Sequence, residues 1–147
     1  MKMEHKLFGY LQYEYQLLQE MIRLAERQQV ALVKYHISEL SEITSFQEAL
    51  IKSIKEAEGK RISYIMDWLK VGMKEATDLQ LSEVIGKIKD EQISAKLKNI
   101  RTELRKSIER LYNLNATNRL LTNRARTNVR DMVTYITDGK AVCNVEV

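Results

Sequence analysis

The sequence predicts an all-α fold, an elongated antiparallel bundle of three long helices with a short connector helix. Its 147 residues include no proline and only five glycines, whereas a sandwich of β-sheets would need more turn residues. Apolar residues recur at steps of three and four along most of the chain, which is the spacing of one face of a helix. Because a chain of this length is usually one domain, we expect a single helical domain over residues 1–147.

The first two long helices are expected over residues 3–34 and 37–71. The phase of the apolar stripe changes around His36, and Glu39 is placed three residues later, where it can reach back to the freed amides as in a capping box. The alternative is one helix of about seventy residues, far longer than the average helix. Gly72 follows the second stripe, and glycine is the favoured residue just past a helix end.

A short connector helix is expected over residues 79–87, where the apolar pattern is weaker and Gly86 closes the segment. Asp90 is a good N-cap residue and predicts the start of the third long helix. This helix runs over residues 90–136, and residues 140–147 are expected to form a loose tail.

The third helix has the longest apolar stripe of the chain. At 1.5 Å per residue it is roughly 70 Å long, so it must be one rod of an elongated bundle. Up to Leu114 the stripe is almost all Ile and Leu, but beyond that residue it includes Asn118, Ala125 and Asn128. We interpret the first part as internal core and the last part as a seam that something else completes.

Composition and termini indicate a soluble, cytoplasmic protein. The single cysteine, Cys143, cannot form an internal disulfide bond, and the N-terminus leads into an amphipathic stretch rather than an apolar signal core. No segment approaches the roughly 18 consecutive apolar residues that span a bilayer.

No catalytic or metal-binding constellation is visible, so we expect no enzyme activity and no cofactor. His5 and His36 are far apart, without nearby cysteines or suitably spaced carboxylates. Cys143 has no histidine partner in its segment, which argues against a catalytic thiol. No glycine-rich phosphate loop is present.

Positive charge is concentrated on the third helix, in a chain whose net charge is +4. One interpretation is a solvated face that keeps a long bundle soluble; the other is recognition of an acidic partner. Nucleic acid is a weaker alternative, because no binding motif is found and the positive residues are spread around the helix. These residues are Lys96, Lys98, Arg101, Arg105, Lys106, Arg110, Arg119, Arg124, Arg126 and Arg130.

Tyr135 stands at the last turn of the third helix, where the bundle has little left to cover it. An amphipathic ring at an exposed helix end is a suitable anchor for a partner protein. The alternative is a tyrosine that caps the core.

Several segments resemble the FlgN-type flagellar export chaperones, and the resemblance covers nearly the whole chain. The most specific pieces are Asn115-Ala-Thr-Asn118-Arg-Leu-Leu121 and Tyr135-Ile-Thr-Asp-Gly139. Smaller pieces in the same order are Glu14-x-x-Leu17-Leu18, Ala31-Leu32, Leu40, Glu58-x-x-Arg61 and Leu81-Ser-Glu-Val-Ile85. The chain departs from the family pattern at Ile136, where glycine commonly follows the tyrosine, and at His36, where aspartate is common.

The resemblance implies a cytoplasmic type III export chaperone that holds hook-associated (hook-filament junction) proteins unpolymerised and delivers them to the flagellar export gate. In the family, the end of the last helix binds a C-terminal amphipathic region of the substrate, and the tyrosine helps docking on the cytoplasmic domain of the gate. Carried onto this chain, export-gate docking falls to Tyr135. Substrate binding falls to a stripe with helix-in-groove spacing, namely Leu114, Asn118, Leu121, Ala125, Val129 and Met132.

Two other functions stay open at this point. A self-associating structural coiled coil or adaptor would complete the stripe of the third helix with another copy. A basic nucleic-acid-binding bundle would lose affinity steeply with salt. For the chaperone we expect a monomer or weak dimer with no direct membrane insertion and no nucleic-acid partner.

Overall fold

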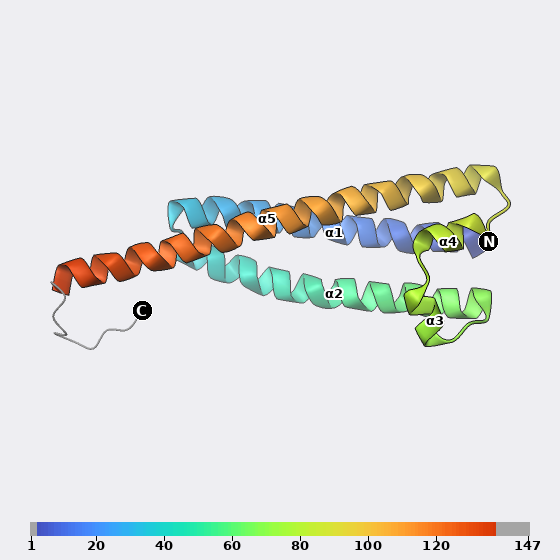
Figure 1. The fold of residues 1–147 in the computed structure, drawn as a ribbon, viewed down its shortest axis with the longest axis horizontal. Helices are drawn as coiled ribbons and strands as arrows, with labels where there is room; N and C mark the ends of the chain where they lie inside the picture. The colour runs from blue at the N-terminus through green and yellow to red at the C-terminus, as the bar shows by residue number, and fades with distance from the viewer. Residues whose placement is uncertain (1–2, 138–147) are drawn as a thin grey trace.

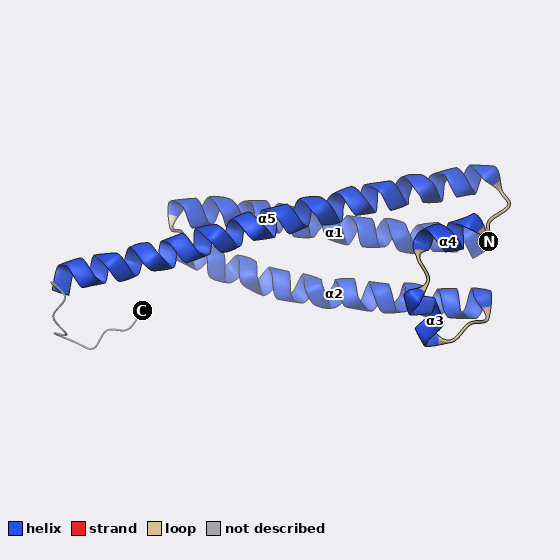
Figure 2. Ribbon diagram, viewed as in Figure 1, coloured by secondary structure: helices blue, strands red, loops and turns tan. Residues whose placement is uncertain are grey.

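The computed structural model describes residues 3–137, and every regular element in this range is an α-helix (Figure 2). The helices are α1 Met3–Lys34, α2 Ile37–Leu69, α3 Met73–Asp78, α4 Leu81–Gly86 and α5 Glu91–Thr137. The all-α prediction is therefore confirmed for the described part of the chain. The tail expected over 140–147, with Cys143, lies outside the described residues.

The central element is α1, which packs on both α2 and α5. Helices α1 and α2 form an antiparallel hairpin, and α5 runs along α1 in the same direction (Figure 1). Within residues 3–137, no Cα atom of α2 lies within 8 Å of one in α5. The long helices therefore form an open arrangement instead of a closed three-helix bundle. Polar and charged side chains, among them Glu58, Arg101 and Arg105, line the space between α2 and α5 together with apolar ones.

The turn between α1 and α2 is built from backbone hydrogen bonds. Tyr35 adopts a left-handed conformation with φ 57°, the amide of His36 donates to the carbonyl of Ala31 at 3.0 Å, and the amide of Tyr35 donates to that of Leu32 at 3.4 Å. This is the pattern of a Schellman motif. The capping-box prediction is wrong, because the His36 amide is already bonded to Ala31. Glu39 instead places its carboxylate 3.6 Å from His36 Nδ1.

The connection between α2 and α5 differs from the sequence-based expectation. Helix α2 ends at Leu69, and the left-handed residue after it is Lys70, with φ 56°, instead of Gly72. Gly72 is the N-cap of α3. The connector contains two short helices, α3 and α4, where the sequence predicted one. Each of them buries apolar side chains in the core, Ala76 from α3 and Val84 and Ile85 from α4.

Asp90 is the N-cap of α5, as predicted, and its carboxylate accepts hydrogen bonds from the amides of Gln92 at 3.0 Å and Ile93 at 3.4 Å. The main apolar core lies at this end of the molecule. Its buried members are Leu7, Leu11, Ile65, Ala76, Val84, Ile85, Ile93, Leu97 and Leu104. A smaller cluster further along the hairpin contains Leu17, Met21, Leu50 and Ala57.

Candidate partner-binding surfaces

Burial along α5 diminishes from its start to its end. Its buried residues are Ile93, Leu97, Leu104, Ser107 and Asn118. Near Asn128, whose Nδ2 donates to the Tyr35 hydroxyl at 3.2 Å, α5 reaches the turn of the hairpin. The helix then continues past that turn, as Figure 1 shows, so its last two turns or so project beyond α1 and α2.

The six predicted substrate contacts do not share one environment. Leu114, Leu121 and Ala125 are half-buried, whereas Val129 and Met132 are exposed, Met132 by 62%. These five side chains leave apolar surface available toward the end of α5. Asn118 differs from them, because its side chain is only 3% exposed.

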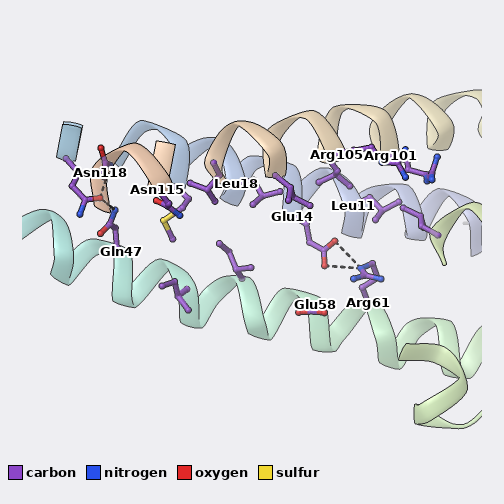
Figure 3. A pocket seen from close by; sticks show the side chains of 18 of the residues that line it. Leu11, Glu14, Leu18, Gln47, Glu58, Arg61, Arg101, Arg105, Asn115 and Asn118 are labelled. Atoms are coloured by element: carbon purple, nitrogen blue, oxygen red, sulfur yellow. Dashed lines mark hydrogen bonds and ion pairs between the residues drawn. The ribbon is translucent and has the colours of Figure 1, made fainter. Parts of the chain in front are cut away.

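Asn118 belongs to a polar layer that connects the three long helices. Its Nδ2 donates to the Ala25 carbonyl at 2.9 Å and to Gln28 Oε1 at 3.2 Å. Gln28 Oε1 also accepts from Gln47 Nε2 at 3.0 Å, so α1 joins α5 to α2 here (Figure 3). A substrate could contact Asn118 through this face only if α5 separated from α1. We therefore assign Asn118 to the packing of α5 against α1 and not to substrate binding.

Tyr135 is 86% exposed at the projecting end of α5. The alternative interpretation, a tyrosine that caps the core, is wrong because no core surrounds the ring at that exposure. Ile136 beside it is also exposed, and the helix continues through it to Thr137. The helix therefore does not bend away at Ile136, the position at which the resemblance leads one to expect glycine.

A groove runs between α2 and α5, with α1 as its floor (Figure 3). Its volume is about 1150 Å³. Apolar side chains from all three long helices line its middle, namely Leu18, Met21, Ile51, Ile54, Ile108 and Leu111. Charged side chains line the part near α4, and polar side chains line the part near Asn118.

An ion pair joins the α2 wall of the groove to its α1 floor at the charged end. Arg61 Nε of α2 donates to both carboxylate oxygens of Glu14 of α1 at 3.0 Å (Figure 3), and both side chains are largely shielded from solvent. Burial raises the pKa of the Glu14 carboxyl, the attraction of Arg61 lowers it in part, and the nearby Glu58 raises it further. Burial has the largest effect of these.

The sequence did not reveal this groove. In the sequence, Glu14, Glu58 and Arg61 belong to the segments that resemble the family, and Arg101 and Arg105 belong to the basic run of the third helix. The available signal was that Glu14 and Arg61 interrupt the apolar stripes of α1 and α2, the two helices whose ion pair lies in the groove. Periodicity alone does not show that two such stripes are neighbours.

The described residues offer no site for a bound metal ion: within 3–137, no group of three or more His, Cys, Asp or Glu side chains could hold one. His5 and His36 do not come together, since one lies near the start of α1 and the other at its end. No helix in the same range is long and apolar enough to cross a membrane.

Comparison with known families gives one match. The family described as FlgN protein matches residues 1–144 of the chain. No curated protein and no solved structure shows a significant match. The family match covers all five helices and the projecting end of α5 with Tyr135, so it applies to the whole fold described above. The chain belongs to the FlgN family, a family of flagellar export chaperones.

Proposed function

We propose that this chain is a cytoplasmic type III export chaperone for flagellar hook-associated proteins. It binds the C-terminal amphipathic region of these proteins, keeps them unpolymerised and delivers them to the export gate. The observation that carries the proposal is the projecting end of α5, which exposes apolar side chains in a member of a chaperone family.

Substrate binding is assigned to the face of α5 that contains Leu121, Ala125, Val129 and Met132. These residues are three or four positions apart, which is the spacing a helical partner needs to lie along the helix. The small side chain of Ala125 permits close approach of the partner. Leu114 extends the same face toward the core.

Tyr135 is assigned to docking on the cytoplasmic domain of the export gate. Its ring lies at the tip of the projecting helix with most of its surface exposed. A tyrosine there can bury its ring against a partner while the hydroxyl keeps a hydrogen bond.

The energetics fit a dissociable complex. A disordered substrate segment that folds on binding loses conformational entropy, and this cost lowers the affinity for a given buried area. Release at the exporter then needs no nucleotide chemistry by the chaperone.

The test is a calorimetric titration of the full chain with a peptide that covers the C-terminal region of a hook-associated protein from the same organism. We expect saturable one-to-one binding with a negative heat-capacity change, because apolar surface is buried. Absence of binding by a protein shown to be folded would refute the proposal.

A self-associating coiled coil is the second candidate, because the exposed apolar residues of α5 could equally be covered by another copy. Sedimentation of the chain over a range of concentrations separates the two functions. A tight dimer that ignores the peptide would favour the second candidate.

A further inference from the structure

The groove between α2 and α5 has the dimensions of a helix-binding site. Along α5 its lining extends from Arg101 to Thr122, which corresponds to roughly 32 Å of helix and thus to about twenty residues of a helical occupant. Helices in direct contact have axes about 8–10 Å apart, but α2 and α5 have no Cα atoms within 8 Å of each other. The two walls therefore stand apart, while α1 closes the floor.

The middle of the groove leaves apolar side chains uncovered. Ile51 of α2 is 45% exposed and Ile108 of α5 is 57% exposed, although both line the groove. Leu18 and Met21 of α1 form the floor between them. A helix with one apolar face would cover these side chains and remove their surface from water.

The α5 wall of the groove carries positive charge that no side chain within residues 3–137 neutralises. Arg101, Arg105 and Arg119 line this wall, and none of the three takes part in an ion pair within residues 3–137. Arg61 is already paired with Glu14. Glu58 on the α2 wall is the other acidic residue of the lining, so the groove has a surplus of cations and favours an acidic occupant.

The polar end of the groove contains an unsatisfied acceptor. Asn118 lines the groove there, and its Oδ1 is buried without a hydrogen-bond partner among the described residues. Buried polar atoms normally have a partner, since an unpaired one costs free energy. Asn118 therefore makes this end of the groove polar.

We propose that this groove binds an acidic amphipathic helix of the exported substrate, as a second contact separate from the projecting end of α5. This inference rests on the proposed chaperone function. The helix places its apolar face against Ile51, Ile54 and Ile108, and an acidic edge against Arg101 and Arg105. Bound in this way, it fills the gap between α2 and α5 and converts the open arrangement into a closed four-helix bundle.

The test compares two neighbouring charge reversals on α5. Arg105→Glu reverses a cation of the groove wall, whereas Lys106→Glu makes the same charge change at the next position, which does not line the groove. Both side chains are exposed, so both variants should keep wild-type helical content. The probe is the C-terminal region of a hook-associated protein from the same organism, titrated into each full-length variant. Arg105→Glu should weaken binding about tenfold or more, and Lys106→Glu by less than about twofold.

A second pair tests the apolar wall on α2. Ile51→Ser removes an exposed isoleucine of the groove, and Phe46→Ser removes an exposed phenylalanine of the same helix that lies outside it. The first change should weaken peptide binding by about fivefold or more through lost apolar burial. The second should leave the affinity unchanged. Together the two pairs separate a site in the groove from a general effect of charge or hydrophobicity.

Each outcome decides the matter. If wild type binds the peptide and the groove variants bind as tightly, the groove proposal is wrong and the chaperone function stands. If Arg105→Glu and Lys106→Glu weaken binding equally, the effect is long-range electrostatics and the groove is not the site. If wild type does not bind the peptide at all, the proposed function fails, and the assignment of a substrate helix to the groove fails with it.

Discussion

Two polar side chains fix how α5 lies on α1. Asn118 bonds to Ala25 and Gln28, and Gln19 Nε2 of α1 donates to Ser107 Oγ at 2.8 Å. Each bond is largely or wholly shielded from water, so a slip of α5 by one helical turn, about 5.4 Å, would leave these groups unpaired. Polar contacts of this kind set the register of paired helices more strictly than apolar side chains do.

Asn118→Ala should therefore destabilise the fold. The change removes two hydrogen bonds and leaves the Ala25 carbonyl without its side-chain partner, which costs about 1–3 kcal/mol. Urea unfolding followed by circular dichroism measures the loss. Asn123→Ala, at an exposed position of the same helix, is the control and should change the free energy of unfolding by less than about 0.5 kcal/mol. Equal stability of Asn118→Ala and wild type would contradict the register role.

Glu14 should make stability depend on pH in a defined direction. Burial raises the pKa of its carboxyl above the ordinary value of 4.5, although Arg61 opposes this. The folded chain then binds more protons than the unfolded chain just above pH 4.5, so the contribution of Glu14 to stability is present below that pH and is lost as pH rises through the folded pKa.

The Glu14→Gln variant cannot titrate at this position and isolates that effect. Between about pH 4 and about pH 7, the difference in unfolding free energy should shift in favour of the variant. Denaturation of both proteins at the two pH values measures the shift. A shift in favour of wild type would mean that Arg61 outweighs burial and that the pKa is lowered.

Tyr135→Ala should separate docking from substrate binding. Truncation of an anchoring aromatic side chain costs at least about 1 kcal/mol of binding free energy, so binding to the cytoplasmic domain of the export gate should weaken by about fivefold or more. Peptide binding and thermal stability should stay at wild-type values, because the ring is exposed. Unchanged motility in cells that carry the variant would contradict the docking role.

For single residues, the sequence predicted whether a position is apolar, polar or exposed better than it predicted which residue contacts that position. The position of Tyr135 at the last turn of the helix indicated an exposed ring but left a core-capping tyrosine open, and the 86% exposure decides between them. Asn118 was placed on the correct stripe, but a stripe does not show which molecule covers it, and α1 covers Asn118 in this fold. The ion pair of Glu14 and Arg61 depends on side chains 47 positions apart, which periodicity cannot connect.

At the scale of elements, α5 combines two different surfaces. Its first half packs into the core with buried Ile93, Leu97 and Leu104, and its last turns expose Val129, Met132 and Tyr135. A helix this long is stable at its far end only because the docked half extends into it, since isolated short helices are marginal in water.

The exposed face at the end of α5 should be required for substrate binding and dispensable for stability. The double variant Val129→Ser, Met132→Ser should weaken peptide binding by about tenfold or more while the melting temperature falls by no more than a few degrees. The matched control is Val30→Ser, Val33→Ser, which alters two exposed valines near the end of α1. Equal losses of affinity in both double variants would show that binding does not depend on the α5 face.

Helix positions were predictable because both signals, the apolar period and the end residues, are local. Asp90 caps α5 through its own side chain, and the break near His36 follows the change of phase. The end of α2 was less predictable, since Lys70 and not Gly72 takes the left-handed conformation. There the buried side chains of α3 and α4 determine where the chain turns, and these are tertiary contacts.

At the scale of the whole molecule, the shape should be visible in solution. α5 has 47 residues and is roughly 70 Å long, so the 17.2 kDa chain should sediment more slowly than a compact sphere of its mass. Analytical ultracentrifugation measures both mass and frictional ratio. We expect a monomer or weak dimer with a raised frictional ratio; a tight dimer at low concentration would support the coiled-coil alternative.

The open arrangement of the long helices was not predictable from the sequence. Apolar periods give the face that each helix buries, but not the angle or the spacing between helices, which depend on how side chains interlock. A closed bundle and the observed arrangement with α1 in the centre use the same stripes. The period of each stripe is the same in both arrangements, so it cannot distinguish them.

The central position of α1 also determines the order in which the molecule assembles. Side-chain hydrogen bonds between α1 and α2 join residues 19 to 61 positions apart, whereas those between α1 and α5 join residues 84 to 93 positions apart. Closing the longer loops costs more chain entropy and takes longer. The hairpin should therefore form first, during synthesis, and α5 should dock last. By the same reasoning, detachment of α5 from α1 is a smaller opening than global unfolding. The helix whose end we assign to substrate binding is therefore the first to detach from the fold.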